Sequence, residues 1–554
     1  MELFNLNAIR RMPGLVLLAG LVFFSCTPPA DKQADKDPLN KTEFILSKSK
    51  LEDKIKGGWA GQTIGVVYGA PVEFKYQGSL IDEYQNIPWN DHYVKYWFDK
   101  KPGLFDDVYT DMNFVDVFEK YGLDVTADAI AAHWASAEYH LAHANQASRY
   151  NILRGMKPPA SGNWKNNPHA DDIDFQIESD FIGMMSPGMV NAATEVADRV
   201  GHIMNSGDGW YGGVFASALY SLAFVSDDPE YVVSQALKAI PEGTKFHDCI
   251  ADVIRLHKEH PDDWKAAWFE LQKKWNKDVG CPKGFFLSFN IDAKINSAYV
   301  AIGLLYGGGD FSRSIDIAAR CGQDADCNPA TVGGVLGVML GYSGIPEFWL
   351  KPLQEIEGLT FEGTESSLNK AYGLSLKHAA AMIEKQGGAL KGEDFTIPLS
   401  RPIPVAFEQN FEHIYPVSRD KIDSSFTREF SFSFTGNGYV LYGNMIKRSK
   451  IDADYLDRLA KRLGTEVFGL AELHDPYVAD IELYIDGKLE ETIKMPMKNT
   501  ARRLEPSWKY QLPEGKHEVT LKWMNHLPDY EIRINDLIVY SEQQPTSNLP
   551  VNQH

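Results

Sequence analysis

The sequence lacks the features that mark several large classes of protein. Five cysteines in 554 residues are too few for a disulfide-built scaffold, and no pair has the C-x-x-C spacing of a zinc ribbon. With 55 Lys+Arg against 75 Asp+Glu, the net charge of −20 argues against a broad basic surface for nucleic acid or anionic membranes. No G-x-S-x-G motif supports a serine hydrolase. After the N-terminal segment, no apolar run reaches the roughly 18 residues of a membrane span.

The N-terminal segment has the pattern of a secretory signal, which we assign to residues 1–26. Arg10 and Arg11 precede an apolar run that ends at Ser25-Cys26. This ending resembles a bacterial lipobox and predicts lipidation of Cys26; cleavage elsewhere or a simple apolar anchor are the alternatives. Residues 27–47 are polar and contain proline, which predicts a flexible tether. We therefore expect a bacterial protein that is lipid-anchored in the periplasm or on the cell surface.

Residues 48–387 have the apolar periodicity of helices and predict an all-α domain. Leu51, Ile55 and Trp59, for example, fall on one helix face. The apolar run 331–341 carries glycine at every fourth position. This spacing leaves bare backbone on one face, which suits close contact with another helix.

The residue pattern changes from helical to strand-like periodicity after the helical region. Residues 388–404 contain the glycines and prolines of a linker. Residues 405–543 show period-two alternation, as at 430–434, and predict an antiparallel, jelly-roll-like β-sandwich. The final residues, 544–554, have the composition of a loose tail.

Three acidic clusters stand out in the helical region. Glu73 follows a glycine-containing helix, Asp106 and Asp107 begin an apolar stretch, and Asp324 and Asp326 precede another. An isolated acidic pair at a helix start is usually an N-terminal cap. Asp-x-Asp spacing, however, lets two carboxylates converge on a hard cation. Two such helix starts and one glutamate provide enough oxygens for a two-ion site.

The order of these motifs resembles that of the ADP-ribosylglycohydrolases, which include the dinitrogenase reductase-activating glycohydrolases. The family's G-x-x-x-G-D-x-x-G and a-P-x-E motifs match residues 57–65 and 70–73. Its T-D-D-T matches 105–108, and its G-x-D-x-D-T-n matches 322–328. The resemblance covers roughly residues 50–385. It implies an all-helical domain that binds two magnesium ions, or manganese, and hydrolyses the bond between ADP-ribose and an acceptor.

The resemblance also implies roles for individual residues. Asp106, Asp107, Asp324 and Asp326 would be metal ligands. Glu73 would be a further ligand or the carboxylate that handles the proton or water, and we take Glu73 and Asp107 as the catalytic candidates.

Several positions depart from the family pattern. Phe105 and Val108 stand where the family has the two threonines of T-D-D-T. Gln62 replaces an aspartate of the first motif, and Cys327 replaces the threonine of the last motif. A thiol is a poor magnesium ligand, so one metal position is in question. Thr110 and Asp111 lie one helical turn after Asp107, and we predict that they supply the missing oxygens.

Polar residues between the motifs predict a sugar pocket in which carboxylates and amides bind hydroxyls and aromatic rings stack. The candidates are Asp180, Asn205, Asp208, Trp210, Tyr211 and Asn328. The alternative is that these residues belong to loops and helix caps. His140 and His143 are spaced i, i+3, which favours a solvated helix face; a zinc site there needs a third ligand that the sequence does not assign.

The sequence thus predicts a two-metal glycohydrolase acting outside the cytoplasm on an ADP-ribosyl, furanosyl or glycan substrate. Its expected partners are this small sugar or glycan and, through the lipid anchor only, a membrane; nucleic acid is not expected. The alternative is a non-catalytic surface glycan-binding lipoprotein with a degenerate metal site. The missing threonines favour that alternative, whereas retention of the four central aspartates and Glu73 opposes it. The predicted sandwich carries aromatic residues of the kind that stack on sugars, although alternating aromatics more often form a core: Tyr439, Tyr442, Tyr484, Trp508, Tyr510 and Trp523.

Overall fold

A computed structural model of the chain describes residues 37–278, 280–448 and 475–544. The predicted signal peptide, the lipidation of Cys26 and nearly all of the predicted tail lie outside these residues. No helix in the described ranges is both long and apolar enough to cross a membrane.

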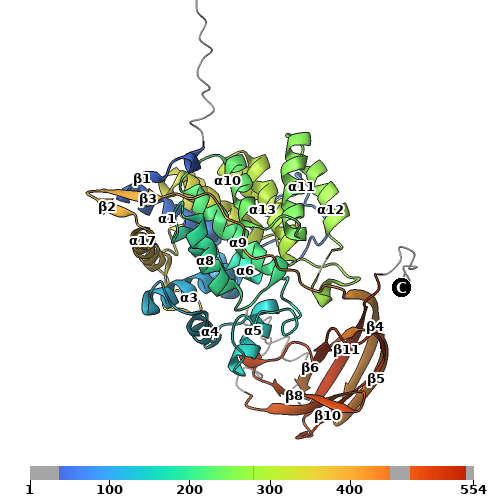
Figure 1. The fold of residues 1–554 in the computed structure, drawn as a ribbon. Helices are drawn as coiled ribbons and strands as arrows, with labels where there is room; N and C mark the ends of the chain where they lie inside the picture. The colour runs from blue at the N-terminus through green and yellow to red at the C-terminus, as the bar shows by residue number, and fades with distance from the viewer. Residues whose placement is uncertain (1–36, 279, 449–474, 545–554) are drawn as a thin grey trace, which may run out of the picture.

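The N-terminal domain is helical, as the periodicity predicted (Figure 1). The α-helices of the described residues are α1 (Lys48–Gly69), α2 (Tyr93–Lys100), α3 (Asp106–Tyr121), α4 (Ala127–Ala135), α5 (His143–Leu153), α6 (Asp174–Ile177), α7 (Asp180–Met184), α8 (Val190–Gly201), α9 (Gly207–Ala223), α10 (Pro229–Ala236), α11 (Lys245–Glu259), α12 (Trp264–Trp275), α13 (Ala293–Gly307), α14 (Phe311–Arg320), α15 (Cys327–Leu340), α16 (Glu347–Leu353) and α17 (Leu368–Lys385).

Helices α1 and α15 pack backbone against backbone at the centre of this domain. Glycines occupy every fourth position of α1 from 57 to 69. A β-carbon on Gly61 would overlap the carbonyl oxygen of Gly333, and one on Gly69 would overlap that of Ala325. Because no side chain separates the two helices, the C-terminal end of α1 lies beside the residues that lead into α15. The glycine spacing predicted such close contact, and the structure supplies the partner helix.

The strands of the described residues are β1 (Glu43–Ser47), β2 (Ala389–Lys391), β3 (Asp394–Pro398), β4 (Tyr415–Phe426), β5 (Glu429–Gly436), β6 (Gly438–Lys447), β7 (Val478–Ile485), β8 (Lys488–Pro496), β9 (Ser507–Lys509), β10 (Gly515–Trp523) and β11 (Tyr530–Ser541). The C-terminal strands form two four-stranded antiparallel sheets, with the orders β5-β10-β7-β8 and β4-β11-β6-β9. The predicted antiparallel sandwich is therefore present.

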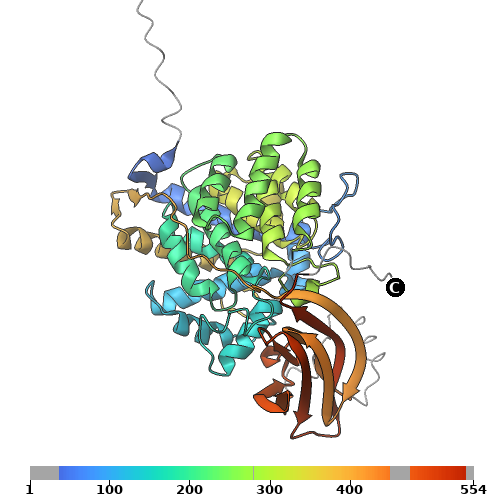
Figure 2. The same cartoon turned by 45° about the vertical axis from the view of Figure 1, so that its right-hand side comes forward.

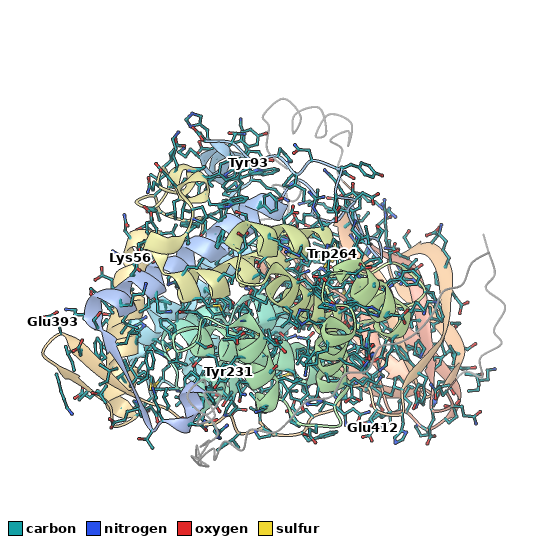
Figure 3. The ribbon with its side chains drawn as sticks, turned by 90° about the horizontal axis from the view of Figure 1, so that it is seen from above. Lys56, Tyr93, Tyr231, Trp264, Glu393 and Glu412 are labelled. Atoms are coloured by element: carbon teal, nitrogen blue, oxygen red, sulfur yellow. The ribbon has the colours of Figure 1, made fainter. Side chains whose placement is uncertain are left out.

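A third, smaller sheet corrects two predictions about connecting segments. The predicted linker 388–404 contains β2 and β3, and the end of the predicted tether 27–47 forms β1. These strands pair antiparallel in the order β1-β3-β2, with Phe395 and Ile397 buried. The glycines and prolines of residues 388–404 suggested an irregular linker, and the apolar positions between them were overlooked. Figure 3 shows Glu393, at the β2–β3 turn, on the side of the molecule opposite the sandwich.

The sandwich packs against the helical domain through one of its sheets. Along β6, Tyr439 and Leu441 point into the core between the sheets, while Val440 and Tyr442 point into an apolar cluster shared with the helical domain. The strand is buried on both faces for this reason. Tyr150 on α5 also donates a hydrogen bond to the carbonyl of Lys494 in β8 at 2.7 Å. Figures 1 and 2 both show the sandwich beside α5.

Candidate metal centre

Five acidic side chains from three separate segments meet at one end of the α1–α15 pair. We call this group the carboxylate cluster: Glu73, Asp106, Asp107, Asp324 and Asp326. The first follows α1, the next two begin α3, and the last two precede α15. The pKa of each Asp is shifted by at least one other member of the group. The structure therefore brings together the residues on which the family resemblance depends.

The residue that joins two of these segments, Gln323, was missed by the sequence analysis. It is buried and has a positive φ of 58°, a conformation that side chains other than glycine rarely adopt. Its backbone N–H donates to the carbonyl of Tyr76 at 2.8 Å, and its Oε1 accepts from the N–H of Gly78 at 3.1 Å. This clamp ties the loop after Glu73 to the loop that carries Asp324.

Burial and mutual repulsion dominate the electrostatics of the carboxylate cluster. Burial, followed by the charge of Glu73, raises the pKa of Asp106 to about 7. Burial also raises the pKa of Asp324 to about 7, with Glu73 and Asp106 adding to the effect. The pKa of Asp107 is raised well above its usual range by burial and then by Asp106 and Asp326. Carboxylates held this close are costly to ionise unless a cation compensates them.

Cys327 stands where the family resemblance places a threonine ligand. Its Sγ lies 3.4 Å from Oδ1 of Asp107 and 3.7 Å from Oδ1 of Asp326, so the thiol donates toward the cluster. One ligand atom each from Asp324, Asp326 and Cys327 lies within 4.8 Å of the others. Burial raises the thiol pKa well above its usual value and keeps the group neutral.

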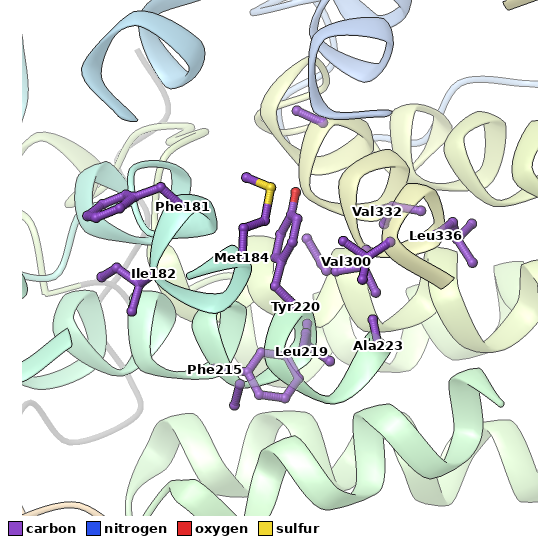
Figure 4. Close-up of a cluster of buried hydrophobic side chains, with 14 of the residues drawn as sticks. Phe181, Ile182, Met184, Phe215, Leu219, Tyr220, Ala223, Val300, Val332 and Leu336 are labelled. Carbon is purple, nitrogen blue, oxygen red and sulfur yellow. The ribbon is translucent and has the colours of Figure 1, made fainter. Parts of the chain in front are cut away.

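A second layer of polar groups lies against the carboxylate cluster. Asp180, at the start of α7, accepts a hydrogen bond from the hydroxyl of Tyr220 at 2.6 Å, and burial raises the pKa of this carboxyl to about 8. Tyr220 rises from the apolar core shown in Figure 4. Asp111 accepts from Nε2 of Gln62 at 3.1 Å and faces the charge of Asp180, while Thr110 is buried beside it in α3. Gln62, where the family has an aspartate, thus holds Asp111.

Asn328, a predicted substrate contact, is buried in the first turn of α15. Its Nδ2 donates to Oδ1 of Asn296 at 2.8 Å, and the same oxygen accepts the backbone N–H of Asp324 at 3.2 Å. Its own Oδ1 is buried and accepts no hydrogen bond from any described residue. Asn296, on α13, therefore positions two parts of the site, although no sequence motif marked it.

Four residues predicted for a sugar pocket make contacts with the scaffold. The amide of Asn205 bonds to backbone groups on both its oxygen and its nitrogen. Asp208 lies 3.4 Å from the buried ammonium of Lys294. Trp210 and Tyr211 are only 1% and 0% exposed, so neither ring has a free face for a sugar. The Gly-rich loop before an Ala-rich helix suggested a pocket. That helix, α9, lies in the core, and the rings of Trp210 and Tyr211 are buried there.

The donor set of the carboxylate cluster fits hard divalent cations. Carboxylate oxygens are the ligands that magnesium prefers, and the repulsion among Asp106, Asp107, Asp324 and Asp326 is what a cation would neutralise. At the rim, where Asp106 is half-buried, Nζ of Lys101 donates to Oε2 of Glu73 at 3.0 Å.

Comparison with known proteins points to the same part of the chain. The profile of the family described as ADP-ribosylglycohydrolase matches residues 47–378, more than half of the sequence. A solved structure described as "ADP-ribosylglycohydrolase-related protein complex" is similar with a TM-score of 0.40 and 14% identity, over 60% of this chain and 99% of that chain. A search of curated proteins finds no match.

Proposed function

Because this chain belongs to the ADP-ribosylglycohydrolase family, we propose that it is a divalent-metal-dependent glycohydrolase acting outside the cytoplasm. Its substrate carries an ADP-ribosyl, furanosyl or related glycosyl group. The observation that supports this proposal best is the convergence of buried carboxylates from three segments within the residues that match the family. The N-terminal signal sequence supports the location.

The residues of the cluster divide into two roles. Asp106, Asp107, Asp324 and Asp326 would hold the divalent cations, with magnesium favoured by an oxygen-only carboxylate set. When bound, such ions orient sugar hydroxyls and neutralise charge on oxygen. The buried Oδ1 of Asn328, which lacks a hydrogen-bond partner among the described residues, would be a further contact.

Glu73 is the residue placed to handle the proton. It lies at the rim of the cluster, where Lys101 fixes one of its oxygens. In hydrolysis of a glycosidic bond, a carboxylate takes a proton from the attacking water or gives one to the leaving oxygen. Asp107 is 2% exposed and surrounded by other carboxylates, so its position suits ion binding better than proton exchange with substrate.

The alternative, a glycan-binding lipoprotein without activity, gains little from the sandwich. Tyr439, Tyr442, Trp508 and Trp523 are buried between the sheets or against the helical domain and offer no stacking platform.

Release of sugar from a panel of ADP-ribosyl and glycosyl compounds, with and without magnesium, tests the proposal. We expect metal-dependent turnover that falls at least about 10³-fold in Asp106→Asn and Asp324→Asn. The matched control is Asp99→Asn, which removes an exposed acid on α2 paired with Lys95. Equal activity in all three variants would place the chemistry elsewhere, and glycan binding without any turnover would favour the alternative.

A further inference from the structure

A second buried cluster of ligand-type side chains lies at the junction of the two domains. We call it the histidine–cysteine cluster: His143, His169, Asp172 and Cys281. His143 begins α5, the next two lie in the loop between α5 and α6, and Cys281 precedes a short 3-10 helix at Pro282–Gly284. The sequence analysis left His143 without a third ligand because its partners lie far along the chain. His140, its predicted companion, points toward Arg502 instead.

One ligand atom each from His143, His169 and Asp172 lies within 4.8 Å of the others, and Cys281 joins this group through His169 and Asp172. Nδ1 of His169 lies 3.0 Å from Oδ2 of Asp172, and Nδ1 of His143 lies 3.4 Å from the same oxygen. Sγ of Cys281 lies 3.4 Å from Nδ1 of His169 and 3.5 Å from Oδ2 of Asp172. Ligand atoms held about 2.0–2.3 Å from a tetrahedral zinc ion lie about 3.3–3.7 Å from one another.

Hydrogen bonding alone does not account for this arrangement. Three side chains converge on one oxygen of Asp172, while its other oxygen, on a side chain that is 0% exposed, accepts no hydrogen bond from any described residue. An ion-pair network would distribute its donors over both oxygens. One monodentate carboxylate facing two imidazoles and a thiol is instead the pattern of a metal ligand set.

The outer contacts of the cluster also have the form found around metal ligands. Nε2 of His169 lies 2.8 Å from Oε1 of Glu505, which is itself buried. A ligating histidine commonly donates its second ring N–H to a carboxylate, which fixes the tautomer and leaves the other nitrogen free for the metal. Glu505 belongs to the sandwich, just before β9, so the contact crosses the domain junction.

We propose that His143, His169, Asp172 and Cys281 bind one transition-metal ion of the zinc class. Two imidazole nitrogens, one carboxylate oxygen and one thiolate sulfur suit zinc, whereas they are a poor set for magnesium. With four protein ligands the site is structural, and it secures the sandwich against the helical domain through Glu505. Thiol chemistry is a poorer explanation, because Cys281 is 1% exposed and unreachable for a substrate.

Metal content of the full-length protein tests the site. The protein is equilibrated with zinc and magnesium, separated from free ions and measured by inductively coupled plasma mass spectrometry. We expect His143→Ala and Cys281→Ser each to bind about one zinc per chain less than wild type. The matched control is Cys321→Ser, a change at a buried cysteine outside both clusters, and this variant should bind as much zinc as wild type. Identical zinc content in wild type, His143→Ala and Cys281→Ser would overturn the proposal.

Cobalt substitution identifies the sulfur ligand directly. A thiolate-to-cobalt charge-transfer absorption is expected in wild type and Cys327→Ser and is lost in Cys281→Ser. A band that disappears only in Cys327→Ser would place the metal in the carboxylate cluster and refute the assignment. If a variant does not fold, anomalous scattering at the zinc edge from wild-type crystals decides the matter. A peak between His143 and Cys281 supports the site, and no peak there overturns it.

Discussion

The carboxylate cluster and the histidine–cysteine cluster are both buried and both built from segments distant in sequence, but their donor atoms differ. The first presents carboxylate oxygens with one neutral thiol beside them; the second presents nitrogen, oxygen and sulfur. Cys327 and Cys281, one from each, even belong to the same apolar cluster. Hard cations prefer the first set and zinc-class ions the second. The two proposed sites therefore differ in the residues around each thiol.

The two clusters also differ in what holds them. A pair of helices in direct backbone contact positions the carboxylates within one domain. Loops position the histidines and Cys281, and the sandwich contributes Glu505 from outside. The first site should therefore depend on helix packing and the second on domain docking.

The largest expected effect comes from breaking the helix pair. Gly61→Ala places a methyl group where the carbonyl oxygen of Gly333 lies, so α1 and α15 must separate. We expect the free energy of unfolding to fall by about 3 kcal/mol or more, measured from the urea transition. The control is Gly373→Ala on α17, which is exposed with open space around it; this change should stabilise the protein by about 0.5–1 kcal/mol. Similar effects in both variants would contradict the close packing.

A smaller effect is expected from weakening the outer contact of the histidine–cysteine cluster. Glu505→Gln keeps the size of the side chain but removes the charge that orients His169. We expect zinc affinity, measured by competition with a chelating dye, to fall about 10–100-fold. Glu491→Gln, which removes the partner of Arg503 in the same domain, serves as the control and should leave zinc affinity as it is. A fall in both variants would show a general effect of sandwich charge.

His202, outside both clusters, is a histidine whose pKa is raised by two neighbouring carboxylates. Burial lowers the pKa of His202, but contacts with Asp198 and Glu408 outweigh burial and raise this pKa to about 9. Because the folded-state value lies above the ordinary value of about 6.5, the stabilisation is complete below that pH and disappears as pH rises through about 9. His202→Gln should therefore lower the free energy of unfolding by about 2 kcal/mol at pH 6, measured by urea unfolding, with the difference shrinking toward pH 10.

The outcome that would contradict this ion-pair interpretation is a difference that stays constant across the pH range. Loss of the ring contact between His202 and Trp210 would produce such a constant difference. The control, His92→Gln, removes an exposed histidine–glutamate pair and should change stability by less than about 0.5 kcal/mol.

The smallest expected effect comes from changing the sulfur of the carboxylate cluster to oxygen. Cys327→Thr restores the residue type that the family has at this position, and a hydroxyl is a better magnesium ligand than a thiol. We expect the apparent magnesium affinity in the activity assay to rise a few-fold, by about 1 kcal/mol or less. The control is Cys321→Ser, which changes a buried cysteine outside both clusters. An equal rise in magnesium affinity in this variant would contradict the role assigned to Cys327.

Local motifs explain why the acidic residues of the candidate metal centre could be predicted. Acidic residues at helix starts and glycines at every fourth position are short-range patterns, so the carboxylate cluster and the close helix contact were visible in the sequence. Gln323 and Asn296 were not, because their roles arise from hydrogen bonds to loops that only meet after folding. Trp210 and Tyr211 were predicted as sugar contacts because aromatic residues near a Gly-rich loop are typical of sugar pockets. Their burial, which places them in the core, could be seen only in the folded structure.

The sequence by itself determined the fold class, the family and the acidic residues, because period-3.6 and period-two patterns and short motifs are properties of neighbouring residues. The tertiary structure alone decided that two strands lie within residues 388–404, that Asp208 pairs with Lys294, and that His143 meets His169 and Asp172, with Cys281 beside the latter two. These contacts join positions far apart in the chain. Their partners are fixed only when the core is packed, and no local pattern specifies which distant donors will converge.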